Sequence, residues 1–458
     1  MCKSTKKVSN DIENPGGFSL PTLFNLSDFN RKKVEVRFNA EQVSNDGGLL
    51  LLNEVENQVG IIGRMVSCIN DPRHQSYVKH STVQMLSQRI MQIAAGYEDA
   101  NDCNSMRNDG ILKVCAGQEQ SMATQPTMSR FENQLSKKEL YNMCKAFVDG
   151  FISSYPSEPN VIILDCDDTA ALLYGQQELG LFNSYYGDTC YMPLHIYEGF
   201  SGKLIMTVLK PGRRSKSIDV FAILRRLIVF LRQHWPNTMI ILRGDSHFCS
   251  QQFMDWSEKQ KKVEFLTGLT GNTVLNKHAK TTIESAEREY KATGKPVKRY
   301  HSFEYKAGSW GHSQRVVVKV EVNSMGTNIR YVASSIKCIR AKALYENAYC
   351  ARGAAELRIK DHKSYLLSDR MSCSSFLANQ FRLFMHSAAY VLIHSLQKEV
   401  LRATEYCNAT MKTIQLKLIK VAARVKILKT KVQIELPVEF CSKWAFEKSL
   451  WIFQVLRI

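Results

Sequence analysis

The chain has 458 residues, with 61 Lys and Arg against 43 Asp and Glu, which gives a formal net charge of +18. Hydrophobic residues make up 44% of the sequence, a share that excludes wholesale disorder. The longest apolar runs are too short for a transmembrane helix, and the polar N-terminus predicts no signal peptide. Thirteen cysteines without a CxxC pair favour reduced thiols in a cytoplasmic protein over a zinc ribbon or a disulfide framework.

Residues 1–34 are polar and basic and predict a flexible arm, and residues 35–155 follow the helical period. Ser81 is positioned to cap a helix, and residues 133–149 read as a second amphipathic helix. Residues 35–155 are interpreted either as a DNA-binding module or as a helical bundle whose residues serve only to pack the core. The first interpretation draws on Arg89, Arg107 and residues 125–130. The apolar stripe of the capped helix consists of Val83, Leu86, Ile90 and Ile93.

Residues 156–269 change to short apolar strands separated by helices. The order strand, strand, strand, helix, strand, helix, strand predicts an α/β fold, in which an antiparallel hairpin opens a mixed five-stranded sheet. Residues 270–335 interrupt this order and predict a β-rich insertion, and residues 336–400 are helical. The expected strands are 161–164, 194–197, 204–209, 238–242, 263–269 and, in the insertion, 315–321.

The final segment, residues 401–458, is basic. Seven cations occur within twenty residues with no acidic residue between them, which favours sequence-independent contact with DNA phosphates over a merely solvated helix face. They are Lys412, Lys417, Lys420, Arg424, Lys426, Lys429 and Lys431.

Two aspartates lie at strand ends of the predicted sheet. Asp167 follows the first strand and Asp245 follows the fourth, and ligands gather at the carboxyl ends of strands in α/β sheets. Each Asp alone is more often a turn or cap residue. Together, and with a third carboxylate from a helix, they form the oxygen ligand set that Mg²⁺ prefers.

The third carboxylate comes from a predicted helix in which four side chains share one face. Tyr349, Arg352, Glu356 and Lys363 stand at offsets 0, 3, 7 and 14, within an arc of roughly 60° at about 100° per residue. An ordinary surface helix does not explain a tyrosine and a carboxylate on this stripe. The spacing favours a metal-binding carboxylate flanked by cations for phosphates.

This spacing, Tyr-x2-Arg-x3-Glu-x6-Lys, resembles the signature of the insertion-sequence four superfamily of DDE transposases. More closely, the chain is similar to the insertion-sequence thirteen-eighty family over residues 35–440. The matching stretches are Asp46–Leu52, Asn70–Arg73, Ala95–Asp102, Gln125–Asn133, Asp165–Thr169, Cys190–His195, Leu242–Ser246 and Ala351–Lys360.

The resemblance implies an RNase H-like catalytic core in which Asp167, Asp245 and Glu356 are catalytic and bind metal. Asp165 is the rival for the first ligand because it lies on the same strand face, and Asp168 is a weaker one. Tyr349, Arg352 and Lys363 would hold DNA phosphates. Arg243 and Lys360 are further expected DNA contacts. Trp310 is expected either to stack on a flipped base or to fill the core of the insertion.

The implied cofactor is Mg²⁺, with Mn²⁺ as a substitute, in a two-metal site, and no nucleotide cofactor is expected. The implied partners are double-stranded DNA, as terminal inverted repeats and target, and a second copy of the chain on paired ends. The implied activity is cut-and-paste excision and strand transfer by a prokaryotic, cytoplasmic and nucleoid-associated protein. The alternatives are a catalytically silent, transposase-derived regulator and a metal-dependent nuclease without strand transfer.

Overall fold

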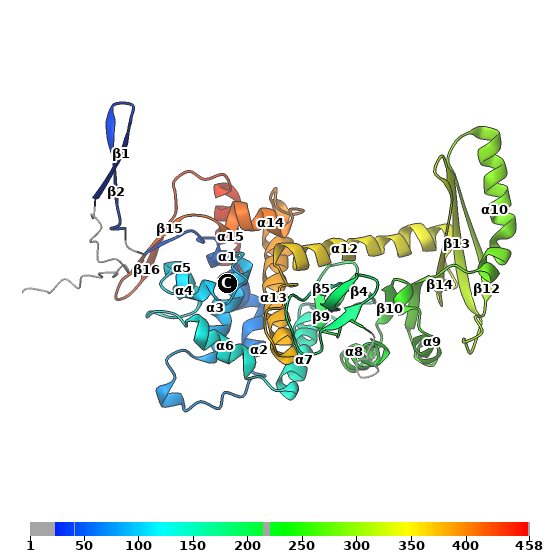
Figure 1. Cartoon of the computed structure of the whole chain (residues 1–458), viewed down its shortest axis with the longest axis horizontal. Coiled ribbons are helices and arrows are strands. Elements are labelled where there is room, and N and C mark those ends of the chain that lie inside the picture. The colour runs from blue at the N-terminus through cyan, green and yellow to red at the C-terminus, as the bar shows by residue number, and fades with distance from the viewer. Residues whose placement is uncertain (1–22, 41, 214–219, 457–458) are drawn as a thin grey trace, which may run out of the picture.

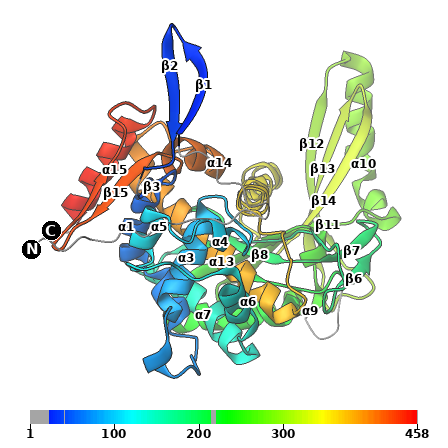
Figure 2. The ribbon, with the colours of Figure 1, turned by 60° about the vertical axis from the view of Figure 1, so that its left-hand side comes forward.

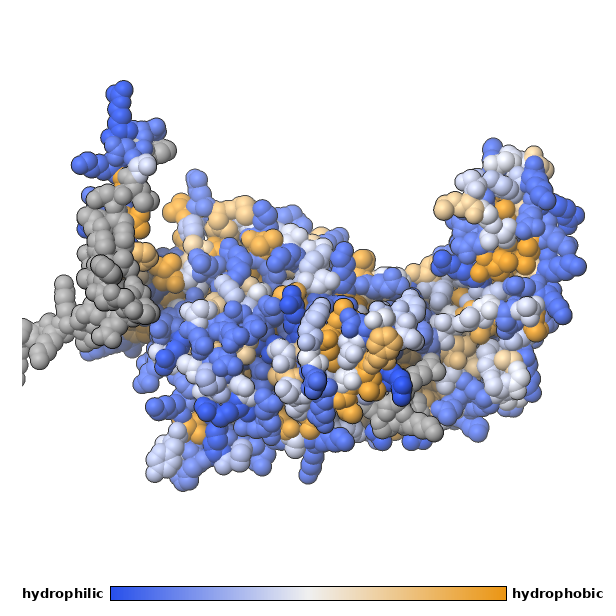
Figure 3. Space-filling view, in the orientation of Figure 1, coloured by the Kyte–Doolittle hydropathy of each residue, from blue (hydrophilic) through white to orange (hydrophobic). Residues whose placement is uncertain are grey.

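The computed structural model describes residues 23–40, 42–213 and 220–456 (Figure 1). A central body of helices and sheet has two projections. One is a hairpin near the N-terminus, and the other contains β12, β13 and β14. The face seen in Figure 3 is largely hydrophilic, with hydrophobic patches over the centre and on the second projection. Every cysteine of the described residues is a free thiol. No helix in the described part of the chain has the length and hydrophobicity to cross a membrane.

The large sheet contains the five strands that the sequence predicts for residues 156–269. Its strand order is β12-β13-β14-β11-β10-β4-β8-β9, in which β4, β10 and β11 run parallel and β8 and β9 are antiparallel to their neighbours. The five strands are β4 (Val161–Asp168), β8 (Leu194–Glu198), β9 (Leu204–Val208), β10 (Met239–Gly244) and β11 (Val263–Leu269).

Two helices connect these strands as predicted. The longer, α8 (Val220–His234), buries its leucines against the apolar side chains of β4 and β10, and α9 (Gln251–Ser257) precedes β11. A second, small sheet was not predicted. It follows β4 directly and consists of β5 (Ala171–Leu172), β6 (Leu181–Asn183) and β7 (Asp188–Tyr191), in the order β5-β7-β6.

The region predicted to be a β-rich insertion combines three strands with one long helix. Its strands β12 (Val297–Tyr305), β13 (Gln314–Asn323) and β14 (Gly326–Ser334) are present, but they extend the large sheet beyond β11. The charged stretch before them forms a 21-residue helix, α10 (Thr273–Thr293), capped by Asn272. Its buried residues, Leu275, Ala279 and Ala286, pack with valines of β13, so tertiary packing stabilises a helix that is polar over most of its surface.

Helices make up most of residues 49–153. The helix α3 (Thr82–Ala94) begins at Ser81 with a capping box, and α7 (Lys137–Ser153) begins in the same way at Ser136. Of the expected stripe, only Val83 is exposed. The remaining helices are α1 (Leu49–Val59), α2 (Ile61–Val66), α4 (Asp102–Ser105), α5 (Gly110–Cys115) and α6 (Gln125–Asn133).

A long C-terminal helix passes through the same core. Nearly all side chains of α13 (Phe376–Ser395) are buried, and they pack with α1, α3 and α7 in one cluster. Residues of α14 (Met411–Ile414) and α15 (Lys443–Leu456) join this cluster. The helical region near the N-terminus and the basic C-terminal segment therefore share one hydrophobic core.

Both ends of the chain depart from the prediction. The described part of the expected arm forms a hairpin of β1 (Leu23–Phe29) and β2 (Lys32–Arg37), and residues 1–22 lie outside the described residues. In the basic segment a helical stretch ends at residue 419, and a hairpin of β15 (Ala423–Ile427) and β16 (Val432–Glu435) follows. This hairpin pairs with β3 (Val43–Ser44).

Candidate active site

Three carboxylates at the end of β4 meet one at the end of β10. The two strands run parallel with Arg243 opposite Asp165 and Gly244 opposite Cys166, so the next residues, Asp167 and Asp245, reach the same edge of the sheet. Asp245 begins a short 3₁₀ turn, and its Oδ1 accepts the backbone N–H of His247 at 2.8 Å.

Asp165 is buried and fully engaged. The Arg243 guanidinium donates to its two oxygens at 2.5 and 2.7 Å, and Arg358 lies 3.7 Å away. Burial raises the pKa of Asp165, and the two arginines oppose the rise. The Arg243 guanidinium, an expected DNA contact, is only 2% exposed in this structure and also donates to the Ala348 carbonyl.

Asp167 lies on the same strand face but in a different environment. Arg352 donates to its Oδ2 at 3.1 Å. Burial raises the pKa of Asp167 to about 6, Arg352 opposes this, and the Asp245 carboxylate raises it further. Two like charges therefore face each other at the ends of β4 and β10, and a cation between them would relieve the repulsion.

Asp168 points to the other face of β4 and pairs with Lys210, whose Nζ lies 2.6 Å from Oδ2. Burial raises the pKa of Asp168, and Lys210 opposes the rise. The pair lines a cavity of about 160 Å³ that also includes Asn183, Arg213 and His247. This cavity joins the end of β4 to the small sheet.

The helical stripe contacts the same edge of the sheet. Residues 341–365 form one helical run that mixes α, 3₁₀ and π turns, comprising α11 (Ala341–Ala343), α12 (Gly353–Lys360) and the turns around them. Figure 1 shows it bridging from β14 to α13. Arg352 reaches Asp167, and the Lys363 Nζ donates to the Ala170 carbonyl at 2.6 Å.

Tyr349 reaches β11 because residue 268 is a glycine. A Cβ at Gly268 would stand 2.7 Å from the Tyr349 hydroxyl oxygen and 3.0 Å from the backbone nitrogen of Ser246. No side chain larger than hydrogen fits there without movement. Three of the four stripe residues, Tyr349, Arg352 and Lys363, thus lie against strand ends.

Glu356 faces the carboxylates across an arginine. Its Oε1 accepts from Arg352 at 2.8 Å, and its side chain is 59% exposed. Since Arg352 also binds Asp167, one guanidinium group separates the two carboxylates. Within the described ranges no three His, Cys, Asp or Glu side chains stand close enough together to hold a metal ion. The donor chemistry nevertheless fits a divalent cation, because Asp167 and Asp245 repel each other and a cationic group already balances Asp167 and Glu356.

Two further expected DNA contacts lie away from this cluster. Trp310 is 8% exposed and packs edge-on against Tyr305 in the core of the extended sheet, so it fills the core in this structure and offers no face to a base. Lys360 is exposed on α12. In the helical region Arg89 is buried with Glu132, whereas Arg107 and Arg130 are exposed.

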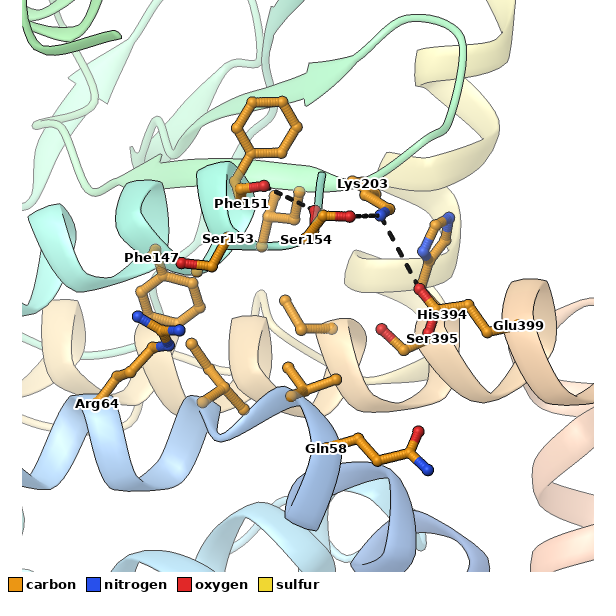
Figure 4. Close-up of a pocket in the computed structure, with 15 residues that line it drawn as sticks. Gln58, Arg64, Phe147, Phe151, Ser153, Ser154, Lys203, His394, Ser395 and Glu399 are labelled. Atoms are coloured by element: carbon orange, nitrogen blue, oxygen red, sulfur yellow. Dashed lines mark hydrogen bonds and ion pairs between the residues drawn. The ribbon is translucent and has the colours of Figure 1, made fainter. Parts of the chain in front are cut away.

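A larger cavity, about 210 Å³, lies between the helices and β9 (Figure 4). Its polar side chains include Lys203, whose Nζ donates to the Ser154 carbonyl at 3.0 Å and lies 3.9 Å from Glu399. It contains none of the four strand-end carboxylates, so the chemistry that they offer lies outside this cavity.

Comparison with known proteins decides the family. The family model described as Transposase DDE domain group 1 matches residues 26–457. The chain belongs to the DDE transposase family. No curated protein matches it. Among solved structures it is similar to the piggyBac transposase in a synaptic complex with hairpin DNA, with 10% identity, a TM-score of 0.43, and coverage of 81% of this chain and 80% of that chain.

Sequence reasoning missed the cations that surround this transposase's carboxylates. Lys210 stands just after β9 and Arg358 stands two residues after Glu356, and neither position has a motif of its own. The available signal for these cations was Asp165, which lies two residues before the candidate ligand Asp167 in an apolar strand. A carboxylate buried in such a strand needs a cationic or hydrogen-bonding partner.

Proposed function

We propose that this DDE transposase binds the inverted repeats of its element and excises and transfers it by metal-dependent, cut-and-paste phosphoryl transfer. The observation that carries the proposal is the convergence of Asp167, Asp245 and the Arg352–Glu356 pair at one sheet edge. The strand order β9-β8-β4-β10-β11, in which β8 alone runs antiparallel to the other four strands, supports an RNase H-like core. The motifs quoted above support membership of the thirteen-eighty family.

Asp167, Asp245 and Glu356 are the proposed metal ligands. Asp165 is a poorer choice because both of its oxygens are held by Arg243, and Asp168 because Lys210 holds it on the opposite face. Bound Mg²⁺, or Mn²⁺ in its place, would make the attacking oxygen a better nucleophile and stabilise the charge on the leaving oxygen.

The other residues of the stripe would hold the DNA backbone. Arg352 offers a planar, two-pronged contact to phosphate oxygens, whereas Lys363 offers a point charge at the start of the small sheet. Tyr349, fitted over Gly268 beside Asp245, would position the strand end. Through these contacts the chain would keep hold of the DNA end that it has cut. A simple nuclease does not need to hold that end.

DNA is the proposed partner outside the active site as well. The net charge is +18, and of the basic C-terminal cluster Lys420 pairs with Asp46 and Lys426 with Glu435. The remaining cations of the cluster favour salt-dependent binding to phosphates. A homodimer on two paired ends is the proposed assembly, since excision needs both ends of an element to be cut.

The test is excision from a plasmid that carries the repeats flanking the gene, with Mg²⁺, by wild type and by Asp245→Asn. We expect excision and integration by the wild type only, with retained binding to the repeats by both proteins. Binding without cleavage by the wild type would instead establish a regulator. Cleavage without joining to target DNA would establish a nuclease.

A further inference from the structure

The small sheet after β4 exposes aromatic side chains. We call residues 171–191, which comprise β5, β6 and β7, the flap. Tyr174 is 88% exposed, Phe182 60%, Tyr185 85% and Tyr186 42%. Single exposed apolar residues are ordinary, but a segment of thirteen residues that exposes four aromatic rings is of the kind that marks interaction sites.

The flap is anchored to the body at its base. The Tyr191 ring packs edge-on against Phe376 of α13, and the backbone N–H of Phe376 donates to the Glu178 carboxylate of the flap at 2.9 Å. Asn183 donates to the Gly212 carbonyl at 2.6 Å. A Cβ at Gly212 would stand 2.2 Å from the Cys190 carbonyl oxygen, so the loop after β9 lies directly on the flap. The exposed rings therefore stand on a fixed support.

The flap lies beside the strand-end carboxylates, because Asn183 of the flap and Asp168 line the same cavity. The flap begins three residues after Asp168, and Figure 2 shows β6 and β7 at the margin of the molecule below the tall strands β12 to β14. Burial, the neighbouring Tyr185 and then the carboxylates of Asp167 and Asp168 raise the pKa of Tyr186. The Tyr185 and Tyr186 rings meet edge to face at 4.9 Å between centroids.

Cations surround the flap on the side of the active site. Lys363 binds the carbonyl of Ala170 at its first strand. Lys210 and Arg213 line the 160 Å³ cavity together with Asn183 of the flap. Aromatic faces combined with positive charge are what proteins use to hold single-stranded nucleic acid, because every base has a face to stack and every nucleotide a phosphate.

We propose that Phe182, Tyr185 and Tyr186 form a stacking platform for unpaired nucleotides of the DNA strand end held at the active site. The inference rests on the proposed function, since it specifies which part of the DNA this site takes. A protein surface is the less favoured occupant, because the flap adjoins the cations and carboxylates of the DNA-cutting site.

The test compares two oligonucleotides that share the terminal repeat, one blunt and one with several unpaired nucleotides at the cleavage point. Binding is measured by fluorescence anisotropy without divalent metal, so that neither DNA is cut. We expect the wild type to prefer the DNA with unpaired nucleotides. The double substitution Tyr185→Ala with Tyr186→Ala should weaken binding of that DNA about 5- to 150-fold, the range for losing one stacked base, and leave blunt binding unchanged.

Two controls separate stacking from other effects. Tyr185→Phe keeps the ring and should keep the preference. Tyr77→Ala removes an equally exposed tyrosine, 84% exposed in the helical region, and should also keep it. The same double variant should abolish quenching of a 2-aminopurine placed among the unpaired nucleotides.

The proposal is overturned if the double variant keeps the preference for unpaired nucleotides, or if it loses binding of blunt DNA to the same extent. It is also overturned if the wild type is a dimer and the double variant is a monomer, because the flap would then be a protein interface. The proposed function fails separately. A wild type that never cleaves with Mg²⁺ but keeps a ring-dependent preference for unpaired nucleotides contradicts the transposase activity and leaves the platform intact. A wild type that excises DNA without any such preference contradicts the platform alone.

Discussion

Asp165 and Asp167 lie two residues apart on one strand face, yet replacing them with Asn should have opposite effects on stability. Asp165 is buried, and Arg243 donates to both of its oxygens. Asp165→Asn leaves that buried guanidinium without its main counter-charge. Breaking a buried ion pair on one side costs about 3–5 kcal/mol, so the unfolding midpoint should fall at every pH at which the wild type is folded.

Asp167 has a pKa of about 6 in the folded chain, raised by burial and by Asp245, against an ordinary value near 3.8. The folded state therefore binds the proton more tightly than the unfolded state. Without metal, stability falls as pH rises from about 4 to about 6 and is then constant. About 2 pKa units at 1.36 kcal/mol each give a cost of about 3 kcal/mol at pH 7.5. Asp167→Asn should remove this cost at pH 7.5 and change little near pH 4.

The assay is urea unfolding in EDTA, followed by tryptophan fluorescence at pH 7.5 and pH 4.0. The double variant Asp165→Leu with Arg243→Met is the control, because replacing both partners with apolar side chains should cost less than the sum of the single changes. An Asp165→Asn protein as stable as the wild type, or an Asp167→Asn protein destabilised at pH 7.5, would refute this division between a structural and a metal-binding aspartate.

Other variants test other contacts. Gly268→Ala should push Tyr349 off β11 and lower both cleavage and the unfolding midpoint. In the control Gly308→Ala the added Cβ meets nothing within 4 Å, so neither quantity should change. Equal effects of the two substitutions would contradict the close fit of Tyr349 over Gly268. Ser136→Ala removes the capping box of α7 and should cost about 1 kcal/mol in urea unfolding, with an unchanged midpoint as the contrary result. Affinity for the repeats should fall steeply between 50 and 200 mM salt, and a flat salt dependence would argue against phosphate contacts.

The sequence predicts well the elements whose signal is local. The helix that begins at Ser81 has its cap and its apolar stripe within a dozen residues, and α3 follows both. The strands β4, β10 and β11 are short apolar runs ending in turn residues, as expected of strands buried in a parallel sheet. The shared face of Tyr349, Arg352, Glu356 and Lys363 is likewise predicted from the residue spacing and helical geometry alone.

Features that depend on distant partners were not predictable. Arg243 looks like a free cation beside Asp245, and only the parallel register of β4 and β10 brings it opposite Asp165. Trp310 is buried because β12 and β13 extend the large sheet and enclose it with Tyr305. The flap strands are two to four residues long, too short for a period of two to be recognised.

The central claim, that Asp167, Asp245 and Glu356 form one metal site, is tested most directly by a change of metal preference. Each residue is replaced in turn by Cys, and cleavage of the repeat DNA is measured with Mg²⁺ and with Mn²⁺. Sulfur is a poor ligand for Mg²⁺ and a better one for Mn²⁺. We predict that the three variants are inactive with Mg²⁺ and regain cleavage with Mn²⁺, while Asp165→Cys does not. Rescue of Asp165→Cys, or of none of the three, would contradict the assignment.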